Sequence, residues 1–259
     1  MSEEVRVERR EGWRTLVLNR PDKLNAANEA MLIALLAALD DAEADHTCRA
    51  LLLTGEGRGF CAGQELGPTV MPGQADLGAI AALHHRFVRR LRGIALPVVC
   101  AVNGVAAGAG VSYALACDIV LAGRSARFLE AFVTIGLVPD SGASFFLPRL
   151  IGEARARALA MLGDTVDAEK AEAWGMIWRV VDDAALMAEA ETLTAHLATQ
   201  PTEALAAMKQ LFAASAVNSL DAQLDLEQAL QAAAGRSADY AEGVRAFLEK
   251  RPAVFRGRR

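Results

Sequence analysis

The chain has 259 residues, 53% of them hydrophobic, and carries a formal net charge of −5. A chain of this length and apolar content can bury a core, which excludes intrinsic disorder, and its acidic balance argues against nucleic acid as a partner. The amino-terminal stretch is charged and lacks the apolar segment of a signal peptide. The apolar region 96–122 is interrupted by glycines and Asp118, so we expect no membrane span and a cytoplasmic location.

Neither a metal site nor a disulfide framework is expected. The chain has four cysteines and four histidines, and no two cysteines form a CxxC pair. Structural zinc sites and redox-active cysteines depend on such closely spaced ligands. Cys61 could still be a nucleophile, but the absence of a histidine nearby in the sequence favours a small packing residue.

Short apolar runs predict four buried strands in the first half of the chain. Asn28 is a predicted helix N-cap, because apolar residues at helical spacing follow it. Glycine-rich turns follow the second and third strands, and the alternation of strand, turn and helix predicts an α/β fold. The predicted strands are Thr15–Leu18, Ala50–Leu53, Pro97–Val102 and Ile119–Leu121.

From about Glu153 the strand pattern fades and alanine-rich helical sequence continues to the carboxyl terminus. Pro201 and Gly235 are predicted breaks between helices. Helices of this kind would cover the active site or pack against another subunit. No linker is rich enough in Pro, Gly or Ser to divide the chain on composition alone.

Two glycine-rich segments stand out, residues 57–66 (GRGFCAGQEL) and 103–118 (NGVAAGAGVSYALACD). Small residues at a strand-to-helix junction let a ligand approach the backbone, and free N–H groups there can bind an oxyanion. Simple turns are the alternative, because such glycine patterns are weak signals when taken singly. The glycine spacing after Gly104 does not match a dinucleotide-binding fingerprint.

Four motifs together resemble the crotonase superfamily, also called the enoyl-CoA hydratase/isomerase family, and the resemblance runs from Val7 to Phe255. It implies a crotonase-like ββα superhelix over residues 1–195 and a helical trimerisation region over 196–259. It further implies an acyl-CoA substrate, no separate cofactor, and a homotrimer or homohexamer. The motifs are GFCAGQEL, NGVAAGAG, LNRPDKLNA and IGLVPDSGASFFLPRL.

The resemblance also assigns roles to residues. The backbone N–H groups of Gln64 and Ala109 would form an oxyanion hole, which polarises a thioester carbonyl. Phe247 and Lys250 would reach the coenzyme A bound to a neighbouring subunit, although a solvated surface lysine is the alternative for Lys250, as it is for Lys23. The remaining positions implied to line the acyl-CoA site are Lys23, Leu24, Ala26, Ala62, Glu65, Leu66, Gly108 and Pro139.

The chain departs from the family's hydratases at both catalytic glutamates. Ser112 and Phe132 stand at these positions, and neither side chain can activate water as a carboxylate does. Asp140 stands where family isomerases and a related dehalogenase carry an acid, and we predict it to be the catalytic base. The alternatives are that Asp140 is a turn residue or a helix cap, and that Glu130 takes a shifted catalytic role.

The resemblance therefore favours a cofactor-free acyl-CoA isomerase over a hydratase. Within the family the motifs are most similar to those of isomerases that convert the ring epoxide of a phenylacetyl thioester to an oxepin. The other possibilities are a Δ3,Δ2-enoyl-CoA isomerase, a hydratase or dehalogenase, and a non-catalytic acyl-CoA binding protein. The segment that contains His84 and His85, after Pro72, is predicted to be either a cover over the acyl group or a solvent-exposed stretch.

Overall fold

A six-stranded sheet forms the body of the molecule in the computed structural model, which describes residues 4–67, 70–71, 73 and 75–257. The strand order is β1-β2-β3-β5-β7-β10, and all neighbours are parallel except β1 and β2. Each predicted strand is found, with slightly different ends. The bounds are β1 Val5–Arg10, β2 Trp13–Leu18, β3 Ala50–Gly55, β5 Val98–Val102, β7 Ile119–Gly123 and β10 Arg179–Val181.

Successive residues of a strand point to opposite faces of the sheet, and here the residues on both faces are apolar. Helices therefore cover both faces. Leu51 and Leu53 of β3 belong to the larger core cluster, with residues of α1 (Glu29–Ala44), α2 (Leu77–Gly93) and α3 (Ala109–Ala116). Leu52 belongs to a second cluster with α7 (Leu186–Ala198). Asn28 caps α1 as predicted, since its side chain accepts a hydrogen bond from Met31 N.

A second sheet, in the order β4-β6-β8-β9, produces the repeated turn of the fold. Three strands of the first sheet are each followed by a strand of the second sheet and then by a helix, which is the expected ββα unit of a crotonase-like fold. The strands are β4 Gly59–Cys61, β6 Val105–Ala107, β8 Arg127–Leu129 and β9 Thr165–Asp167, and the helices that follow the units are α2, α3 and α4 (Ala143–Ile151).

The expectation of purely helical structure after Glu153 is wrong. Two short strands, β9 and β10, lie among the later helices and extend the two sheets. The helices are as expected in type, and Pro201 and Gly235 do separate them, because α8 begins at Thr202 and α9 ends at Ala234. The remaining bounds are α5 Glu153–Leu162, α6 Ala168–Ala173, α8 Thr202–Ser215, α9 Leu220–Ala234 and α10 Ala238–Glu249.

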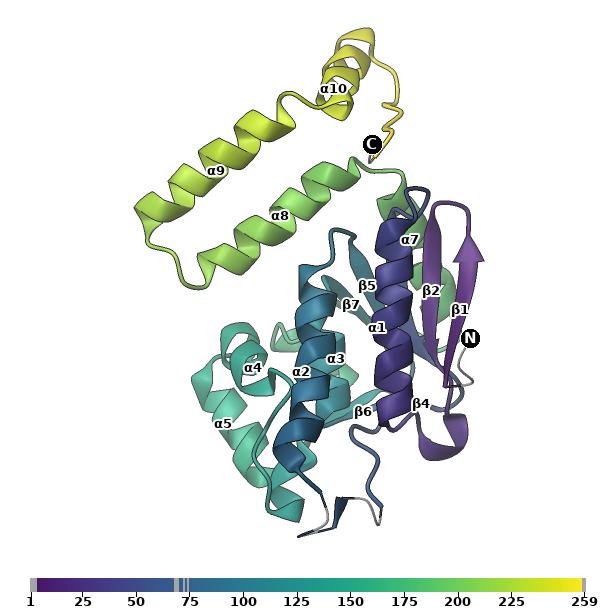
Figure 1. Cartoon of the computed structure of the whole chain (residues 1–259), viewed down its shortest axis with the longest axis vertical. Coiled ribbons are helices and arrows are strands. Elements are labelled where there is room, and N and C mark those ends of the chain that lie inside the picture. Colours follow the sequence, from purple (N-terminus) through teal and green to yellow (C-terminus); the bar gives the residue numbers. More distant parts are fainter. Residues whose placement is uncertain (1–3, 68–69, 72, 74, 258–259) are drawn as a thin grey trace.

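The last three helices extend away from the two sheets (Figure 1). Helices α8 and α9 lie side by side, and no residue of α9 is buried in the single chain. Helix α8 is attached to the body by Lys209, and the carboxyl-terminal tail is attached by Arg49, which donates hydrogen bonds to the carbonyls of Gln200 and Phe255. Among the described residues, no helix is both long and apolar enough to cross a membrane.

Candidate active site

The turn after β2 supports the first glycine-rich segment. Leu24 and Asn25 both have left-handed backbone conformations, with φ of 49° and 55°. The buried Asn25 side chain donates hydrogen bonds to the carbonyls of Glu56 and Gly59, and Ala62 N donates to the carbonyl of Leu24. The predicted ligand-binding turn is thus fixed against the segment that leads to Gln64.

The two glycine-rich segments meet at Gly63 and Gly110. A Cβ atom on Gly63 would lie 2.8 Å from the carbonyl oxygen of Ala107 and 3.5 Å from Ala109 N. A Cβ atom on Gly110 would lie 2.2 Å from the carbonyl oxygen of Cys61. Only glycine permits such close backbone approach, so the sequence of both loops brings the Gln64 and Ala109 segments together.

The backbone amides of Gln64 and Ala109 have no protein acceptor among the residues that the structure describes. Ala27 bridges the backbone on both sides of Gln64, donating to Gly63 O and accepting from Glu65 N, so it leaves the amide of Gln64 unused. Ala109 is the first residue of α3, where N–H groups lack helical partners and the helix dipole favours negative charge. This arrangement can bind an oxyanion, and that Gln64 and Ala109 do so stays a prediction.

Asp140 is held in a strained turn beside α3. Its Oδ1 accepts a 2.8 Å hydrogen bond from Ser141 Oγ, and its carbonyl accepts one of 3.3 Å from Ser112 Oγ. Ser141 has φ of 53°, which a residue with a side chain rarely adopts. A turn is present, because Ala143 N donates to Asp140 O, but the Asp140 side chain does not cap α4, whose N-cap is Gly142. Asp140 is half-buried.

Ser112 and Phe132, which the resemblance places at the positions of the two hydratase glutamates, carry a hydroxyl and a phenyl group. Ser112 is buried in α3. The ring of Phe132 lies 3.5 Å from the place where a Cβ atom on Gly108 would stand, so the ring packs directly against the α3 amino terminus. The site therefore offers a hydrophobic surface beside the two amides.

Glu130 is a buried carboxyl group, and the sequence left open whether it takes part in catalysis. It follows β8, is fully buried, and neither side-chain oxygen has a hydrogen-bond partner within the described parts of the chain. Burial, followed by the nearby Asp140 carboxylate, raises the pKa of Glu130 to about 8. Glu130 therefore holds a proton at neutral pH, because its oxygens are shielded from solvent.

The alternative that His84 lies in a solvent-exposed stretch is wrong, while a cover over the acyl group stays a prediction. Pro72 lies outside the described residues, but His84 itself lies in α2 and is 1% exposed. Its Nδ1 is hydrogen-bonded to the hydroxyl of Tyr113 and its Nε2 to Gln64 Oε1. A signal was present in the sequence, because His84 shares helical spacing with the buried Phe87, Val88 and Leu91.

Cys61 is a packing residue, as predicted. The side chain is buried in β4, and this burial raises the pKa of its thiol to about 12. A thiol with such a pKa is protonated at neutral pH and is a poor nucleophile.

The residues predicted to line the acyl-CoA site fall into two groups in the structure. Most of them surround the two amides or the turn after β2, where Glu65 forms a 2.8 Å ion pair with Arg20 and Lys23 is exposed. Phe247, which is 82% exposed, and Lys250 lie instead on α10 and its end, far from β4 and β6 in Figure 1. One chain alone does not bring these two residues to the rest.

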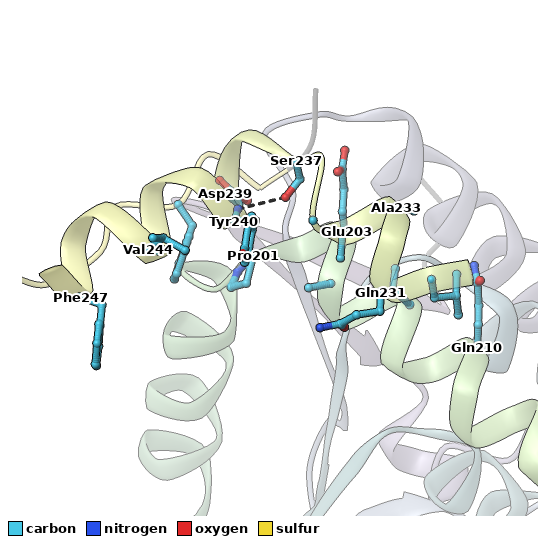
Figure 2. Close-up of a pocket in the computed structure, with 18 of the residues that line it drawn as sticks. Pro201, Glu203, Gln210, Gln231, Ala233, Ser237, Asp239, Tyr240, Val244 and Phe247 are labelled. Atoms are coloured by element: carbon cyan, nitrogen blue, oxygen red, sulfur yellow. Dashed lines mark hydrogen bonds between the residues drawn. The ribbon is translucent and has the colours of Figure 1, made fainter. Parts of the chain in front are cut away.

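A cavity of about 950 Å³ lies between the carboxyl-terminal helices. Figure 2 shows Tyr240 and Val244 of α10 on one side of it and Gln210 and Gln231 on the other, with Phe247 at its edge. The cavity is lined mainly by apolar surface, and no residue of the amide pair borders it. It is therefore separate from the candidate active site.

Sequence comparison agrees with the geometry. The model of the enoyl-CoA hydratase/isomerase family matches residues 8–258. This chain belongs to the enoyl-CoA hydratase/isomerase family. It is therefore an enzyme of the crotonase type, with the ββα fold and the closely approaching glycine-rich loops described above.

Individual family members differ in the reaction named for them. The 1,2-epoxyphenylacetyl-CoA isomerase of Escherichia coli is 53% identical over 95% of this chain and 96% of its own length. The 2,3-dehydroadipyl-CoA hydratase of the same organism is 34% identical over 98% of this chain and 99% of its own. The crystal structure of an enoyl-CoA hydratase from Bacillus anthracis superposes with a TM-score of 0.94 at 27% identity, covering 98% of this chain and 99% of that one.

Proposed function

We propose that this enzyme isomerises an acyl-CoA thioester without a separate cofactor, using Asp140 as the proton-transferring base. The proposal depends on which acidic side chains lie around α3. Ser112 and Phe132 replace the two hydratase glutamates, while the Asp140 turn is hydrogen-bonded to Ser112. The site thus has one partly buried carboxylate for proton transfer, and neither position of the two hydratase glutamates holds a carboxylate to orient water.

In the proposed mechanism the thioester oxygen lies between the N–H groups of Gln64 and Ala109. These dipoles stabilise the enolate that forms when Asp140 removes a proton from the α-carbon, and one such donor is typically worth about 10²–10³ in rate. The same carboxyl group returns the proton at another carbon. Atoms and electrons balance, because one C–H bond breaks, another forms, and the double bond shifts.

The proposed substrate is 1,2-epoxyphenylacetyl-CoA, and the proposed product is the oxepin thioester. Here Asp140 removes the α-proton, the carbon–carbon bond of the epoxide opens so that the ring expands, and the proton returns to a ring carbon, with no change in mass. The support is the 53% identity to the Escherichia coli isomerase over almost the full length of both chains. A Δ3,Δ2-enoyl-CoA isomerase is the second candidate, because the same proton shuttle would move an alkene along a linear acyl chain.

We further propose a homotrimer, or a hexamer of two trimers, as the working form. Helices α8–α10 expose a set of large apolar residues, and Phe247 and Lys250 cannot reach the amide pair of their own chain. Contact with a neighbour would bury the apolar set and bring those two residues to the neighbour's ligand. The exposed residues include Phe212, Val217, Leu220, Leu224, Tyr240, Val244, Phe247 and Leu248.

The test is a panel of acyl-CoA thioesters assayed for isomerisation at constant mass. We expect turnover of 1,2-epoxyphenylacetyl-CoA, and a loss of at least about 10²-fold in kcat for Asp140→Asn. Asp182→Asn, in an exposed ion pair with Arg124, is the control and should keep the wild-type rate. Near-normal turnover by Asp140→Asn on every substrate would reject the base. Binding of phenylacetyl-CoA with no α-proton exchange in D₂O would favour the non-catalytic alternative.

A further inference from the structure

Two buried side chains and the half-buried side chain of Gln64 form a continuous hydrogen-bonded chain behind the candidate oxyanion hole. Tyr113 of α3 and His84 of α2 are both at most 1% exposed, and the Tyr113 hydroxyl is bonded to His84 Nδ1. The other ring nitrogen, Nε2, lies 2.7 Å from Gln64 Oε1. Neither of these hydrogen bonds involves Asp140.

The direction of each hydrogen bond follows from the last partner in the chain. Gln64 Nε2 donates a 2.9 Å hydrogen bond to the carbonyl of Glu65, so Oε1 is the amide atom that faces His84 and must accept. His84 Nε2 therefore carries a hydrogen, and Nδ1 accepts from the Tyr113 hydroxyl. This is the neutral imidazole with one defined tautomer, and burial lowers the pKa of His84 in agreement with it.

The chain joins the two segments that carry the candidate amide donors. Gln64 supplies one amide from its own backbone. Tyr113 lies four residues after Ala109, one turn along the same face of α3. His84 comes from a third element, α2, and so links the loop of Gln64 to the helix of Ala109.

The link to α2 and α3 adds to the contacts that hold this loop to the turn after β2, namely the hydrogen bonds of Ala27 and the Arg20–Glu65 ion pair. Gln64 lies in an irregular stretch between β4 and α2, and its backbone contact to the body is an isolated bridge to Ala27. A donor pair stabilises an enolate only when both N–H groups point at one position, and a displacement of about 1 Å can cost on the order of 10²-fold in rate.

We propose that His84 is a positioning residue that fixes the Gln64 amide relative to the Ala109 amide, acting through the Gln64 side chain and the Tyr113 hydroxyl. This inference rests on the proposed function, because it takes the two amides to be the oxyanion hole. The charged or titratable groups that face the His84–Tyr113 pair are Asp140, His85 and Cys61. The role is that of a fixed neutral donor, and no proton passes from His84 to substrate.

Cinnamoyl-CoA bound to the intact enzyme reports this positioning directly. Its conjugated carbonyl absorbs at longer wavelength when hydrogen bonds polarise it, and the readout does not need Asp140 to act as a base. We expect a red shift with wild-type enzyme, and at most half of it with His84→Phe. His84→Gln, which retains a donor and an acceptor, should restore part of the shift. Tyr113→Phe, which removes only the hydroxyl, should lose part of the red shift. This variant tests the proposal if His84→Phe does not fold.

Kinetics give an independent readout on the same variants. The rate of α-proton exchange into phenylacetyl-CoA in D₂O should fall about 10–100-fold in His84→Phe, while the dissociation constant of that thioester changes less than about threefold. Phe87→Leu is the control for packing, because Phe87 is buried and its ring contacts Tyr113 edge-on at 5.0 Å without joining the chain. It should lower Tm yet keep the red shift.

The outcomes separate this inference from the proposed function. No red shift in the wild-type enzyme would overturn the oxyanion hole and the inference with it. A normal wild-type shift that is unchanged in both His84→Phe and Tyr113→Phe would overturn the inference and leave the proposed function standing. Equal losses of the shift in Phe87→Leu and His84→Phe would also overturn it, since core packing alone would then explain the effect.

Discussion

Lys209 of α8 places its ammonium group 2.8 Å from the carboxylate of Asp118, in the connection between α3 and β7. The side chains are only 13% and 20% exposed, and Asp118 also accepts a hydrogen bond from Val98 N. Lys209 in turn donates to the carbonyl of Leu96. One side chain thus connects the carboxyl-terminal helices to the edge of the main core.

Lys209→Met should lower the free energy of unfolding by about 1–3 kcal/mol, because it leaves a largely buried carboxylate without its cation. Urea unfolding followed by circular dichroism measures the change. Arg157→Met, which breaks an ion pair with both side chains more than 60% exposed, should cost no more than about 1 kcal/mol. Equal effects of the two substitutions would show that the Lys209 contact does not anchor α8.

Glu130→Gln should change how stability depends on pH. The pKa of Glu130 is about 8 in the folded chain against an ordinary value of 4.5, so the folded state binds the proton more tightly in that interval. Its contribution to stability is therefore present below about pH 4.5 and is lost as pH rises towards 8.

The measurement is the urea midpoint of wild type and Glu130→Gln at pH 5.5 and pH 8.5. Between these two pH values the urea midpoint should fall further for the wild type than for Glu130→Gln. The corresponding difference in the free energy of unfolding is several kcal/mol at most, given about 1.4 kcal/mol per pKa unit. Glu153→Gln, at an exposed carboxylate, is the control. Parallel pH dependences for all three proteins would contradict the burial of an unpartnered carboxyl.

Cys61→Ala should leave turnover within about threefold of wild type. The thiol lies beside the candidate amides, yet its raised pKa of about 12 keeps it protonated and unreactive. All four cysteines are buried, so the native enzyme should resist iodoacetamide until it is unfolded, as mass spectrometry would show. Labelling of Cys61 in the native state, blocked by an acyl-CoA, would argue against a packing role.

Gly110→Ala should reduce activity by about 10²-fold or more and destabilise the fold by about 1–3 kcal/mol. The added methyl group would lie 2.2 Å from the carbonyl oxygen of Cys61, which is backbone that has no room to move aside. Ala109→Gly, one residue earlier, keeps the N–H group and should retain activity within about fivefold. Steady-state kinetics on the same thioester compares the two, and a fully active Gly110→Ala would contradict the tight approach of the loops.

The sheet's central strands could be predicted because each is a continuous apolar run with turn residues after it. Strands β9 and β10 could not, since each has three residues and is specified by pairing with β8 and β7, more than 30 residues earlier. Strand β1 alternates valines with charged residues at an edge of the sheet, and its pattern is too short and too polar to stand out.

The candidate site divides in the same way. The two glycine-rich loops could be predicted from the sequence, because only glycine permits the close backbone approach at these positions. The chain through His84 could not, because its meaning depends on Tyr113 and Gln64, which lie 29 and 20 residues away. The isolation of Glu130 is likewise a property of its surroundings, and no local pattern distinguishes it from an exposed glutamate.

The side-chain hydrogen bonds of Arg49 can form only late in the synthesis of the chain. Arg49 precedes β3, yet its guanidinium is bonded to the carbonyls of Gln200 and Phe255, which are translated 151 and 206 residues later. The contact of Arg49 with the tail therefore stays unmade until Phe255 has left the ribosome. A product that stops before Phe255 would lack this attachment of the tail that follows α10, and its last helix would be a ready target for proteases.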